Sequence, residues 1–457
     1  MFKRILAAVM SAAIILALSS CGKDEPKRPE PELTEDGKKI VKMYAWRALD
    51  TDIYDFIRNF NARSDEYEVQ FTELTVEYGG DKGNEKFNAD IAAGNYPDIL
   101  LYNWEVQFPI ESYAQKGMLA NLYDFIDTDP DINREDYIEN LFKAYETDGK
   151  LYKVITSFSI ITLAGKSSIV GTEQGISFER LTELVNEYPD KPFETKNDAF
   201  GTFITYGYNN YIDADTGVCR FDSEEFISLL EFCNQFPNEF YEPQNADDIQ
   251  YYLLDREAAL LNGTMPFDNM MIDRFGNVKY SEYMQFGEPV TFIGYPGVGG
   301  NGSVINPCDT KFSILSIGAN PEGAWEFIKY FYSDAYQNKF VTEKVNGKYC
   351  NRFPIKKSAL EQLAEESKQL VWDSDEKEYV EPYYFWGGKK IPIGVNTDED
   401  NRRIYDLING AVAENINFDV TGIIKEEAGA YFAGQKSAED VAEIIQNRVQ
   451  NYLDENR

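Results

Sequence analysis

The feature that most constrains the fold is an alternation of strand and helix signals near the start of the folded part. Residues 39–46 (KIVKMYAW) are an apolar run typical of a buried strand, and residues 67–74 (YEVQFTEL) alternate in polarity as a strand does. Between them, residues 53–60 carry apolar side chains at helical spacing. Residues 83–94 indicate a helix closed by a glycine, and residues 97–103 (PDILLYN) indicate a third strand. This succession predicts an α/β fold with a parallel sheet.

Polar and aromatic side chains directly follow two of these strands. Trp46 ends the first strand with Arg47 behind it, and Asn103 and Trp104 follow the third strand. Because ligands of open parallel sheets bind beyond the carboxyl ends of the strands, we expect these four side chains to line a binding cleft. Arg47 is the one basic residue of the four, and this scarcity of Arg and Lys disfavours an anionic ligand.

Two helices later in the chain are marked by capping signals. Asn320 is followed by Pro321, which favours the first position of a helix, and Trp325 in that helix is predicted to be a core residue. Residues 437–440 (SAED) match a capping box and precede the apolar stripe of a closing helix. No repeat or low-complexity linker interrupts the folded part. The domains of a chain of this size are therefore not simply joined end to end.

The N-terminus predicts export and a membrane anchor. Lys3 and Arg4 precede an apolar run over residues 5–18, and two serines then lead to Cys21. This order describes an export signal, and the run is too short for a stable transmembrane helix. The stretch LSSC resembles the lipobox of bacterial lipoproteins, in which cleavage before the cysteine is followed by its lipidation. The alternative is an ordinary signal peptide with an incidental cysteine.

Charge and composition define the next segment and exclude several partners. Residues 22–38 contain no aromatic residue and three prolines among dense charges, so we expect a disordered tether. Without the signal peptide the chain has 78 acidic residues and 42 basic residues, the latter being 44 minus Lys3 and Arg4. This excess argues against nucleic acid and anionic lipid surfaces as partners, because both require a positive surface.

The absence of histidine excludes several kinds of chemistry. With no histidine in 457 residues, neither Ser-His-Asp nor Cys-His catalysis, nor a His-ligated metal, is available. Besides Cys21, the cysteines are Cys219, Cys233, Cys308 and Cys350, and none forms a CxxC pair. We therefore predict no metal and no cofactor. A disulfide between Cys219 and Cys233 is possible but not favoured, because Cys233 continues an apolar helical stripe.

Three further motifs are predicted to be structural. Residues 297–302 satisfy G-x-G-x-x-G, but the chain after them does not indicate a helix that could hold a phosphate. Residues 127–136 imitate the start of a calcium loop but lack its glycine, so we expect a capped turn. The acidic runs at 373–381 and 397–400 are expected to be solvated faces.

Several segments together resemble one known family. The run DIAAGNYPDILLYN is similar to the "aaGdgPDi" segment of extracellular solute-binding proteins of ABC importers, the family 1, maltose-binding-protein-like group. Further segments resemble the same family in the same order: YAQKGMLANLYDFID, TDGKLYKV, PEGAWEFIKYF, FPIKKSAL and the terminal YFAGQKSAEDVAEIIQNRVQNYLDE. The resemblance covers most of residues 39–457.

This resemblance implies a two-lobed, periplasmic-binding-protein-like fold of type II, with hinge crossovers around a ligand cleft. The crossovers are expected near residues 157–160, 295–299 and 345–355. The implied division is a signal peptide (1–20), a lipidated Cys and tether (21–38), an N-terminal lobe (39–156 plus about 297–350) and a C-terminal lobe (about 157–296 plus 351–457).

The implied function is capture of a carbohydrate on the extracellular face of the cell membrane. The protein would be anchored by lipid at Cys21, expected to be monomeric, and would deliver an oligosaccharide to an ABC permease without catalysis. Sugar sites pair aromatic faces with polar groups that share hydrogen bonds with hydroxyls. On this ground the candidate ligand-binding residues are Trp46, Arg47, Asn103, Trp104, Ser157, Tyr295, Trp372 and Trp386.

Two alternatives remain open. A lipid-anchored glycoside hydrolase needs only two carboxylates, about 5 Å or about 6.5–9.5 Å apart, and sequence spacing does not reveal such a pair. A surface glycan-binding protein without a transporter would favour a rigid β-sandwich, which the strand and helix alternation disfavours.

Overall fold

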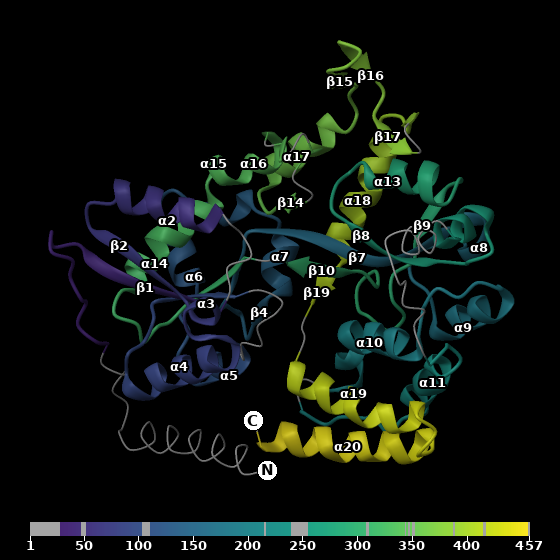
Figure 1. The fold of residues 1–457 in the computed structure, drawn as a ribbon, viewed down its shortest axis with the longest axis horizontal. Helices are drawn as coiled ribbons and strands as arrows, with labels where there is room; N and C mark the ends of the chain where they lie inside the picture. The colour runs from purple at the N-terminus through teal and green to yellow at the C-terminus, as the bar shows by residue number, and fades with distance from the viewer. Residues whose placement is uncertain are drawn as a thin grey trace. The chain divides into compact units, whose positions relative to one another are not determined.

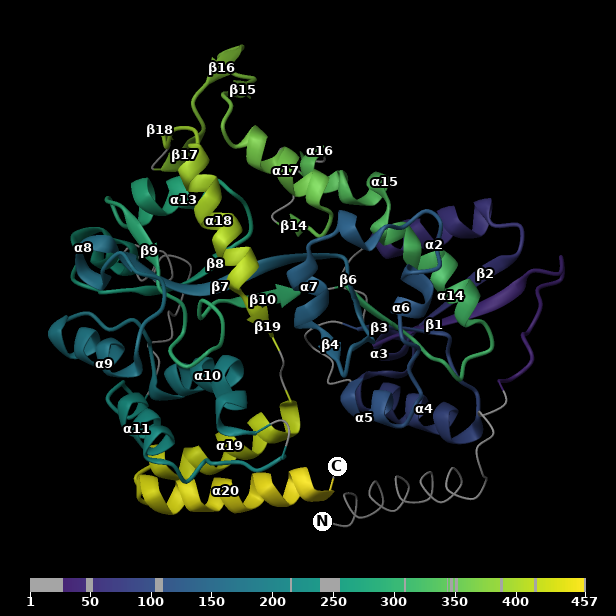
Figure 2. The same ribbon diagram turned by 180° about the vertical axis from the view of Figure 1, so that it is seen from behind.

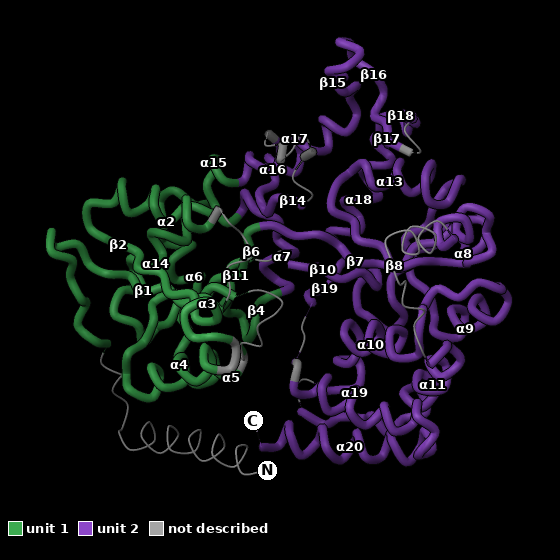
Figure 3. Tube along the Cα trace, viewed as in Figure 1, with its two compact units in different colours: residues 1–134, 145–156, 308–336 green, residues 135–144, 157–307, 337–457 purple. Residues whose placement is uncertain are grey.

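The computed structural model describes residues 28–46, 52–102, 110–213, 216–238, 255–307, 310–342, 344–345, 348–349, 352–386, 389–414 and 417–455. The chain divides into two compact units (Figure 3). Unit 1 comprises residues 1–134, 145–156 and 308–336, and unit 2 comprises residues 135–144, 157–307 and 337–457. The units meet along the chain at 134/135, 144/145, 156/157, 307/308 and 336/337, and the predicted lobe division and crossovers stay predictions. The hinge itself stays a prediction.

Unit 1 contains a five-stranded sheet (Figure 1). Its strands, in spatial order, are β2 (Tyr67–Glu73), β1 (Lys39–Ala45), β3 (Ile99–Tyr102), β11 (Lys311–Ile314) and β6 (Val154–Ile155). Strand β1 pairs in parallel with both β2 and β3, and β11 runs antiparallel to its neighbours. The parallel α/β arrangement predicted for the start of the folded part is therefore present.

Short helices surround this sheet. They are α2 (Asp52–Arg63), α3 (Leu74–Tyr78), α4 (Gly80–Ala93), α5 (Ile110–Gln115), α6 (Tyr123–Ile126), η1 (Arg134–Asp136, at the boundary), α14 (Pro321–Ile328), η4 (Lys329–Tyr332) and α15 (Asp334–Gln337, at the boundary), with the hairpin β4 (Glu146–Thr147)–β5 (Lys150–Leu151). Helix α4 ends as predicted at Gly94, whose φ of 78° places it in the left-handed region. Pro321 begins α14, but the Asn320 side chain does not cap it, because its amide donates to the Ile40 carbonyl at 2.5 Å.

A buried carboxylate joins β1, the start of β3 and the start of α14. Asp98 lies just before β3, and its two oxygens accept hydrogen bonds from the backbone amides of Asn320 (2.6 Å) and Lys42 (2.8 Å). Burial raises the pKa of Asp98 to about 6 in spite of these hydrogen bonds. The Asp98 carboxylate therefore ties three separate segments of unit 1 together.

Unit 2 is built around one long strand, β7 (Ser157–Lys166). The path of the sheet is β14 (Phe353–Pro354), β7, β10 (Val304–Pro307) and β19 (Val412–Ala413). In addition, β8 (Asp268–Ile272) pairs with residues 160–164 of β7, and β9 (Val290–Phe292) pairs with residues 164–166. Phe158 pairs with both Pro307 of β10 and Phe353 of β14. The first residues of β7 thus lie beside the end of β10 and beside β14.

Helices pack beside this sheet, and Figure 2 shows α10, α11, α19 and α20 as one group of neighbouring helices. The described helices of unit 2 include α7 (Glu139–Ala144), α8 (Ser167–Val170), α9 (Phe178–Glu187), α10 (Lys196–Gly207), η2 (Tyr208–Tyr211), α11 (Glu224–Cys233), α13 (Asn277–Tyr280), η3 (Ser281–Gln285), α16 (Lys339–Thr342), α17 (Lys357–Glu366), α18 (Asp398–Gly410), α19 (Phe418–Phe432) and α20 (Ala438–Glu455), and residues 255–262 are also helical. A small hairpin, β12 (Lys344–Val345)–β13 (Lys348–Tyr349), belongs to the same unit. As predicted, α20 begins after Ser437, whose hydroxyl accepts from the Asp440 amide at 3.1 Å.

Between α17 and α18 the chain forms two hairpins, β15 (Val371–Asp373)–β16 (Glu378–Val380) and β17 (Tyr383–Trp386)–β18 (Lys389–Pro392). Residues 370–392, here called the aromatic arm, lie at one end of unit 2 in Figure 1, with β15–β16 outermost. The expectation that both acidic runs are solvated faces is wrong for two residues. Asp373 is buried and pairs with Lys390, and buried Asp400 closes the capping box of α18 with Thr397.

Other sequence predictions have clear outcomes. Cys219 and Cys233 are both buried free thiols, so the possible disulfide between them is absent, and Cys21, Cys308 and Cys350 lie outside the described residues. The glycine run at 297–302 is followed by β10 and not by a helix, as expected. Trp325 is buried, and its indole nitrogen donates to Asp129 at 2.8 Å in the turn that imitates a calcium loop.

Candidate functional site

The strand-exit residues of unit 1 are only partly described. Trp46 directly follows β1, as predicted, but only 6% of its surface is exposed. Its ring lies 4.9 Å from that of Phe87, and its indole nitrogen donates to Asn84 at 2.5 Å. In this structure the Trp46 ring therefore packs into unit 1 and offers little surface to a ligand. Arg47, Asn103 and Trp104 lie outside the described residues, so their roles stay predictions.

The two candidates within the unit 2 sheet are buried and lie toward opposite ends of β7. Ser157 is the first residue of β7 and pairs with Pro354. Tyr295 follows β9, and its hydroxyl donates to the Asn269 side chain at 2.6 Å. Its ring lies 5.0 Å from that of Tyr206, and burial raises its pKa, so the phenol stays neutral.

Sequence reasoning missed the partners of Tyr295. Tyr206 lies in α10 among apolar residues, where the helical stripe gave no reason to distinguish it from a core residue. Asn269 is an exposed residue of β8, a strand that the sequence reading did not identify. Their relationship to Tyr295 depends on strand pairing with β7, which brings β8 and β9 to the same segment.

The remaining two candidates belong to the aromatic arm. Trp372 in β15 is 54% exposed, in contrast to Trp46 and Tyr295. Trp386 is the last residue of β17, and its side chain is outside the described part. Within unit 2 the structure therefore brings Trp372 and Trp386 onto neighbouring hairpins, but it does not place them with Ser157 or Tyr295.

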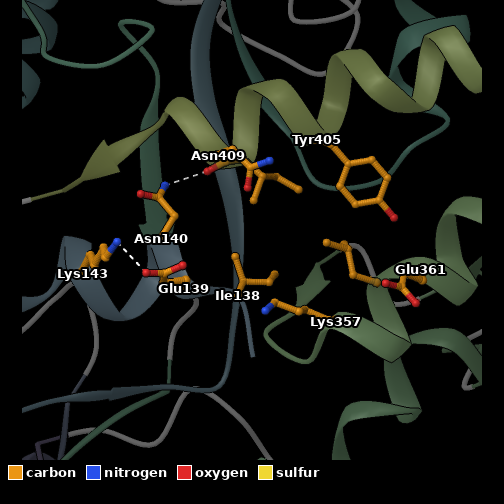
Figure 4. A pocket seen from close by; sticks show the side chains of 10 residues that line it. Ile138, Glu139, Asn140, Lys143, Lys357, Glu361, Tyr405 and Asn409 are labelled. Carbon is orange, nitrogen blue, oxygen red and sulfur yellow. Dashed lines mark hydrogen bonds and ion pairs between the residues drawn. The ribbon is translucent and has the colours of Figure 1, made fainter. Parts of the chain in front are cut away.

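A pocket that no sequence signal indicated lies within unit 2 (Figure 4). It has a volume of about 430 Å³ and is formed by α7 and the residue before it, by α17 and by α18. Its lining residues are Ile138, Glu139, Asn140, Lys143, Lys357, Leu360, Glu361, Tyr405, Ile408 and Asn409. These residues come from three distant stretches of the chain, which is why local sequence patterns do not reveal the pocket.

Hydrogen bonds fix the walls of this pocket. The Asn140 amide donates to the carbonyls of Ile408 (2.7 Å) and Ala411 (2.8 Å), which attaches α7 to the end of α18. On the opposite wall, the Lys357 ammonium donates to the Glu135 carbonyl at 2.8 Å. The backbone amide of Ile138 donates to Ile355 at 3.0 Å. These bonds explain why residues 135–144 belong to unit 2.

The pocket offers mixed polar groups over an apolar floor. Lys143 forms an ion pair with Glu139 at 2.5 Å, and Ile138, Leu360 and Ile408 are buried beneath the polar groups. Burial raises the pKa of Tyr405 to about 12, with a further contribution from the nearby carboxylate of Glu361. The Tyr405 phenol is thus a neutral hydrogen-bond donor at physiological pH. Such a set of groups suits hydroxyl-bearing or zwitterionic small molecules.

The described part of the chain contains neither a metal-site cluster nor a helix that could cross a membrane. There, no group of three or more Cys, Asp or Glu residues is arranged to hold a metal ion. None of the helices described combines the length and apolar character needed to span a bilayer.

Comparison with known proteins identifies relatives in sequence and in fold. The family model described as "Bacterial extracellular solute-binding protein" matches residues 55–371. No curated protein matches the chain in sequence.

Three solved structures show the same fold at low sequence identity. The sugar-binding protein MalE from Xanthomonas citri is similar with a TM-score of 0.54 and 12% identity, covering 91% of this chain and 98% of its own. The substrate-binding protein Lmo0181 from Listeria monocytogenes, in complex with cycloalternan, has a TM-score of 0.52 and 13% identity, with coverages of 91% and 99%. The cyclic alpha-maltosyl-1,6-maltose binding protein from Arthrobacter globiformis has a TM-score of 0.51 and 12% identity, with coverages of 92% and 100%.

Proposed function

Because the chain belongs to the bacterial extracellular solute-binding protein family, we propose that it is the receptor of an ABC importer and that it captures an oligosaccharide. The family match over residues 55–371 carries this proposal. The ligands of the structural neighbours support the substrate class, since cycloalternan and cyclic maltosyl-maltose are both oligosaccharides. The fold also supports the proposal, because almost the whole length of these neighbours aligns with this chain.

The mode of capture and delivery follows from the same proposal. Two lobes that close on a ligand by hinge motion would present a bound form to the permease. The lipid attached at Cys21 would hold the protein on the extracellular face of the membrane, and the charged segment after it would act as a tether. Support for the anchor comes from the lipobox-like LSSC stretch and from the apolar run before it.

A thermal-shift screen of the chain from residue 22 onward tests this function. The panel holds monosaccharides, linear and cyclic oligosaccharides, polyols and amino acids. A ligand that binds only the folded state stabilises it by about 2.7 kcal/mol at a hundredfold excess over the dissociation constant. We expect a shift with an oligosaccharide that is recovered intact after incubation.

The other outcomes each contradict part of the proposal. Cleavage of the sugar during incubation would indicate a glycoside hydrolase instead. A shift with an amino acid alone would retain the receptor and change its substrate class. Binding of an intact sugar by a protein whose deletion leaves uptake of that sugar unchanged would indicate a glycan-binding protein without a transporter.

A further inference from the structure

Exposed aromatic side chains are concentrated on the aromatic arm. Among the described residues, fourteen large hydrophobic side chains are exposed, and five of them lie within the short stretch 370–385. These five are Leu370, Trp372, Tyr379, Tyr384 and Phe385. Single exposed hydrophobic residues need no explanation, whereas a concentration of them marks an interaction surface.

The two outermost aromatic residues form a pair. Trp372 of β15 lies directly opposite Tyr379 of β16 in the hairpin, and their ring centroids are 5.2 Å apart at 69°. The two side chains therefore project from the same face of the hairpin. Both are more than half exposed, so solvent reaches the rings on that face.

The base of the arm is held by polar contacts. Asp373, between the exposed residues, is buried and pairs with Lys390 of β18, which joins the two hairpins. The Lys390 ammonium also pairs with Glu376 at 3.1 Å, and it lies 4.9 Å from the centre of the Tyr383 ring. Tyr384 packs against Tyr280 of α13 with ring centroids 5.0 Å apart. These contacts hold the two hairpins to each other and to α13, and such fixing lowers the entropic cost of binding a partner.

The charges around the aromatic pair select the type of partner. The exposed acidic residues of the two hairpins, Asp375, Glu376, Glu378 and Glu381, outnumber the exposed basic residues, Lys377 and Lys389. An anionic membrane surface would be repelled by this excess. Protein interfaces are enriched in Tyr and Trp but depleted in Asp and Glu, so the carboxylates that surround this aromatic pair fit a protein partner less well than a neutral glycan. Neutral glycans fit, because aromatic faces contact their CH groups and carboxylates accept hydrogen bonds from their hydroxyls.

We propose that the aromatic arm is a contact surface for a neutral glycan chain, with Trp372 and Tyr379 as its stacking residues. This inference rests on the proposed function and extends it, since the outer hairpin β15–β16 would hold a part of the glycan that the transported sugar site, to which Trp386 of β17 is assigned, does not enclose. More than half of each of the two side chains is exposed, so this open surface suits a long chain better than a monosaccharide.

Affinity electrophoresis and calorimetry test this proposal with the complete mature protein. Native gels contain soluble starch, xylan, mixed-linkage β-glucan or galactomannan. Calorimetry measures the affinity for the short sugar that raises the melting temperature in the thermal-shift screen. The test variant is Trp372→Ala/Tyr379→Ala. The control is Tyr78→Ala, which removes an aromatic residue of unit 1 that is 40% exposed. We expect retention of the native protein by at least one polysaccharide, a tenfold or greater loss of that affinity in the double variant, and no loss in the control.

The outcomes distinguish the arm from the proposed function. If no polysaccharide retains the native protein, or if the double variant is retained equally, the arm is not a glycan surface. If the double variant keeps its retention but fails to support uptake in cells, the arm contacts a protein partner and our inference is wrong. If retention depends on the arm while no short sugar binds, the inference stands and the importer function fails.

Discussion

The backbone amide of Asn320 donates a 2.6 Å hydrogen bond to the buried carboxylate of Asp98. These residues are far apart in sequence, and their contact joins the start of α14 to the residue before β3. A charged carboxylate at this position is costly because only 1% of Asp98 is exposed. Hydrogen bonds from two amides offset this cost only in part, since the pKa of Asp98 remains raised.

This pKa predicts a specific dependence of stability on pH. The pKa rises from its ordinary value of 3.8 to about 6 in the folded state, so the folded protein binds the proton more tightly than the unfolded chain does. The resulting stabilisation is fully present below pH 3.8 and is lost as pH rises through 6. It amounts to about 3 kcal/mol, from about 1.4 kcal/mol per pKa unit.

The substitution Asp98→Asn removes this dependence. We expect the free energy of unfolding, measured in urea between pH 4 and pH 7, to fall by about 2.4 kcal/mol less in the variant than in the native protein, because part of the stabilisation is already lost at pH 4. The exposed Asp65 offers a control, since Asp65→Asn should leave the slope unchanged. Equal slopes in the native protein and Asp98→Asn would show that Asp98 is not the group responsible.

A second prediction concerns the ion pair that joins the two hairpins of the arm. The substitution Lys390→Met removes the ammonium that pairs with Asp373 and holds the pKa of that carboxyl well below its usual range. We expect amide hydrogen exchange over residues 371–392 to become at least tenfold faster, because the contact between the hairpins is lost. The neighbouring Lys389 is exposed, so Lys389→Met should leave the exchange rates within about twofold of native. Unchanged rates in Lys390→Met would contradict the role of this pair.

A third prediction concerns the attachment of α7. The substitution Asn140→Ala leaves the carbonyls of Ile408 and Ala411 without the amide that now donates to them. Loss of these partly buried hydrogen bonds, which leaves two carbonyls without their donor, costs about 1–3 kcal/mol of unfolding free energy. Asn409→Ala changes an exposed residue of the same pocket, and its effect should stay within about 0.5 kcal/mol. Chemical unfolding of both variants checks this, and equal small losses would mean that the Asn140 bonds do not hold α7.

The fourth prediction addresses the tryptophans proposed to contact the transported sugar. Trp104→Ala and Trp386→Ala should each weaken binding of that sugar at least tenfold by calorimetry, with little change in melting temperature. Trp325→Phe is the matched control, because Trp325 is buried and bonded to Asp129. This control should lower the melting temperature and leave affinity unchanged. Native affinity in both alanine variants would refute the site assignment.

Elements with strong local signals could be predicted from the sequence. The strands β1, β2 and β3 lie within the predicted stretches 39–46, 67–74 and 97–103, and α4 ends at Gly94, because hydrophobic periodicity and a terminating residue act locally. The predicted family was also correct, because the resemblance rests on several sequence segments in the order that the family has them.

The environment of individual side chains depended on tertiary contacts. Asp373 and Asp400 lie in acidic runs that look solvated, yet both are buried, because Lys390 and Lys279 reach them from other segments. Trp46 directly follows a strand and Trp372 lies within one, but the Trp46 ring packs on Phe87 whereas the Trp372 side chain is exposed to solvent.

The sequence by itself thus determined the α/β class, the order of the early strands and helices and the family, while only the tertiary structure decided which charges and aromatic rings are exposed. The physical reason is that periodicity is a property of neighbouring residues, whereas burial is set by whatever distant segment packs against them.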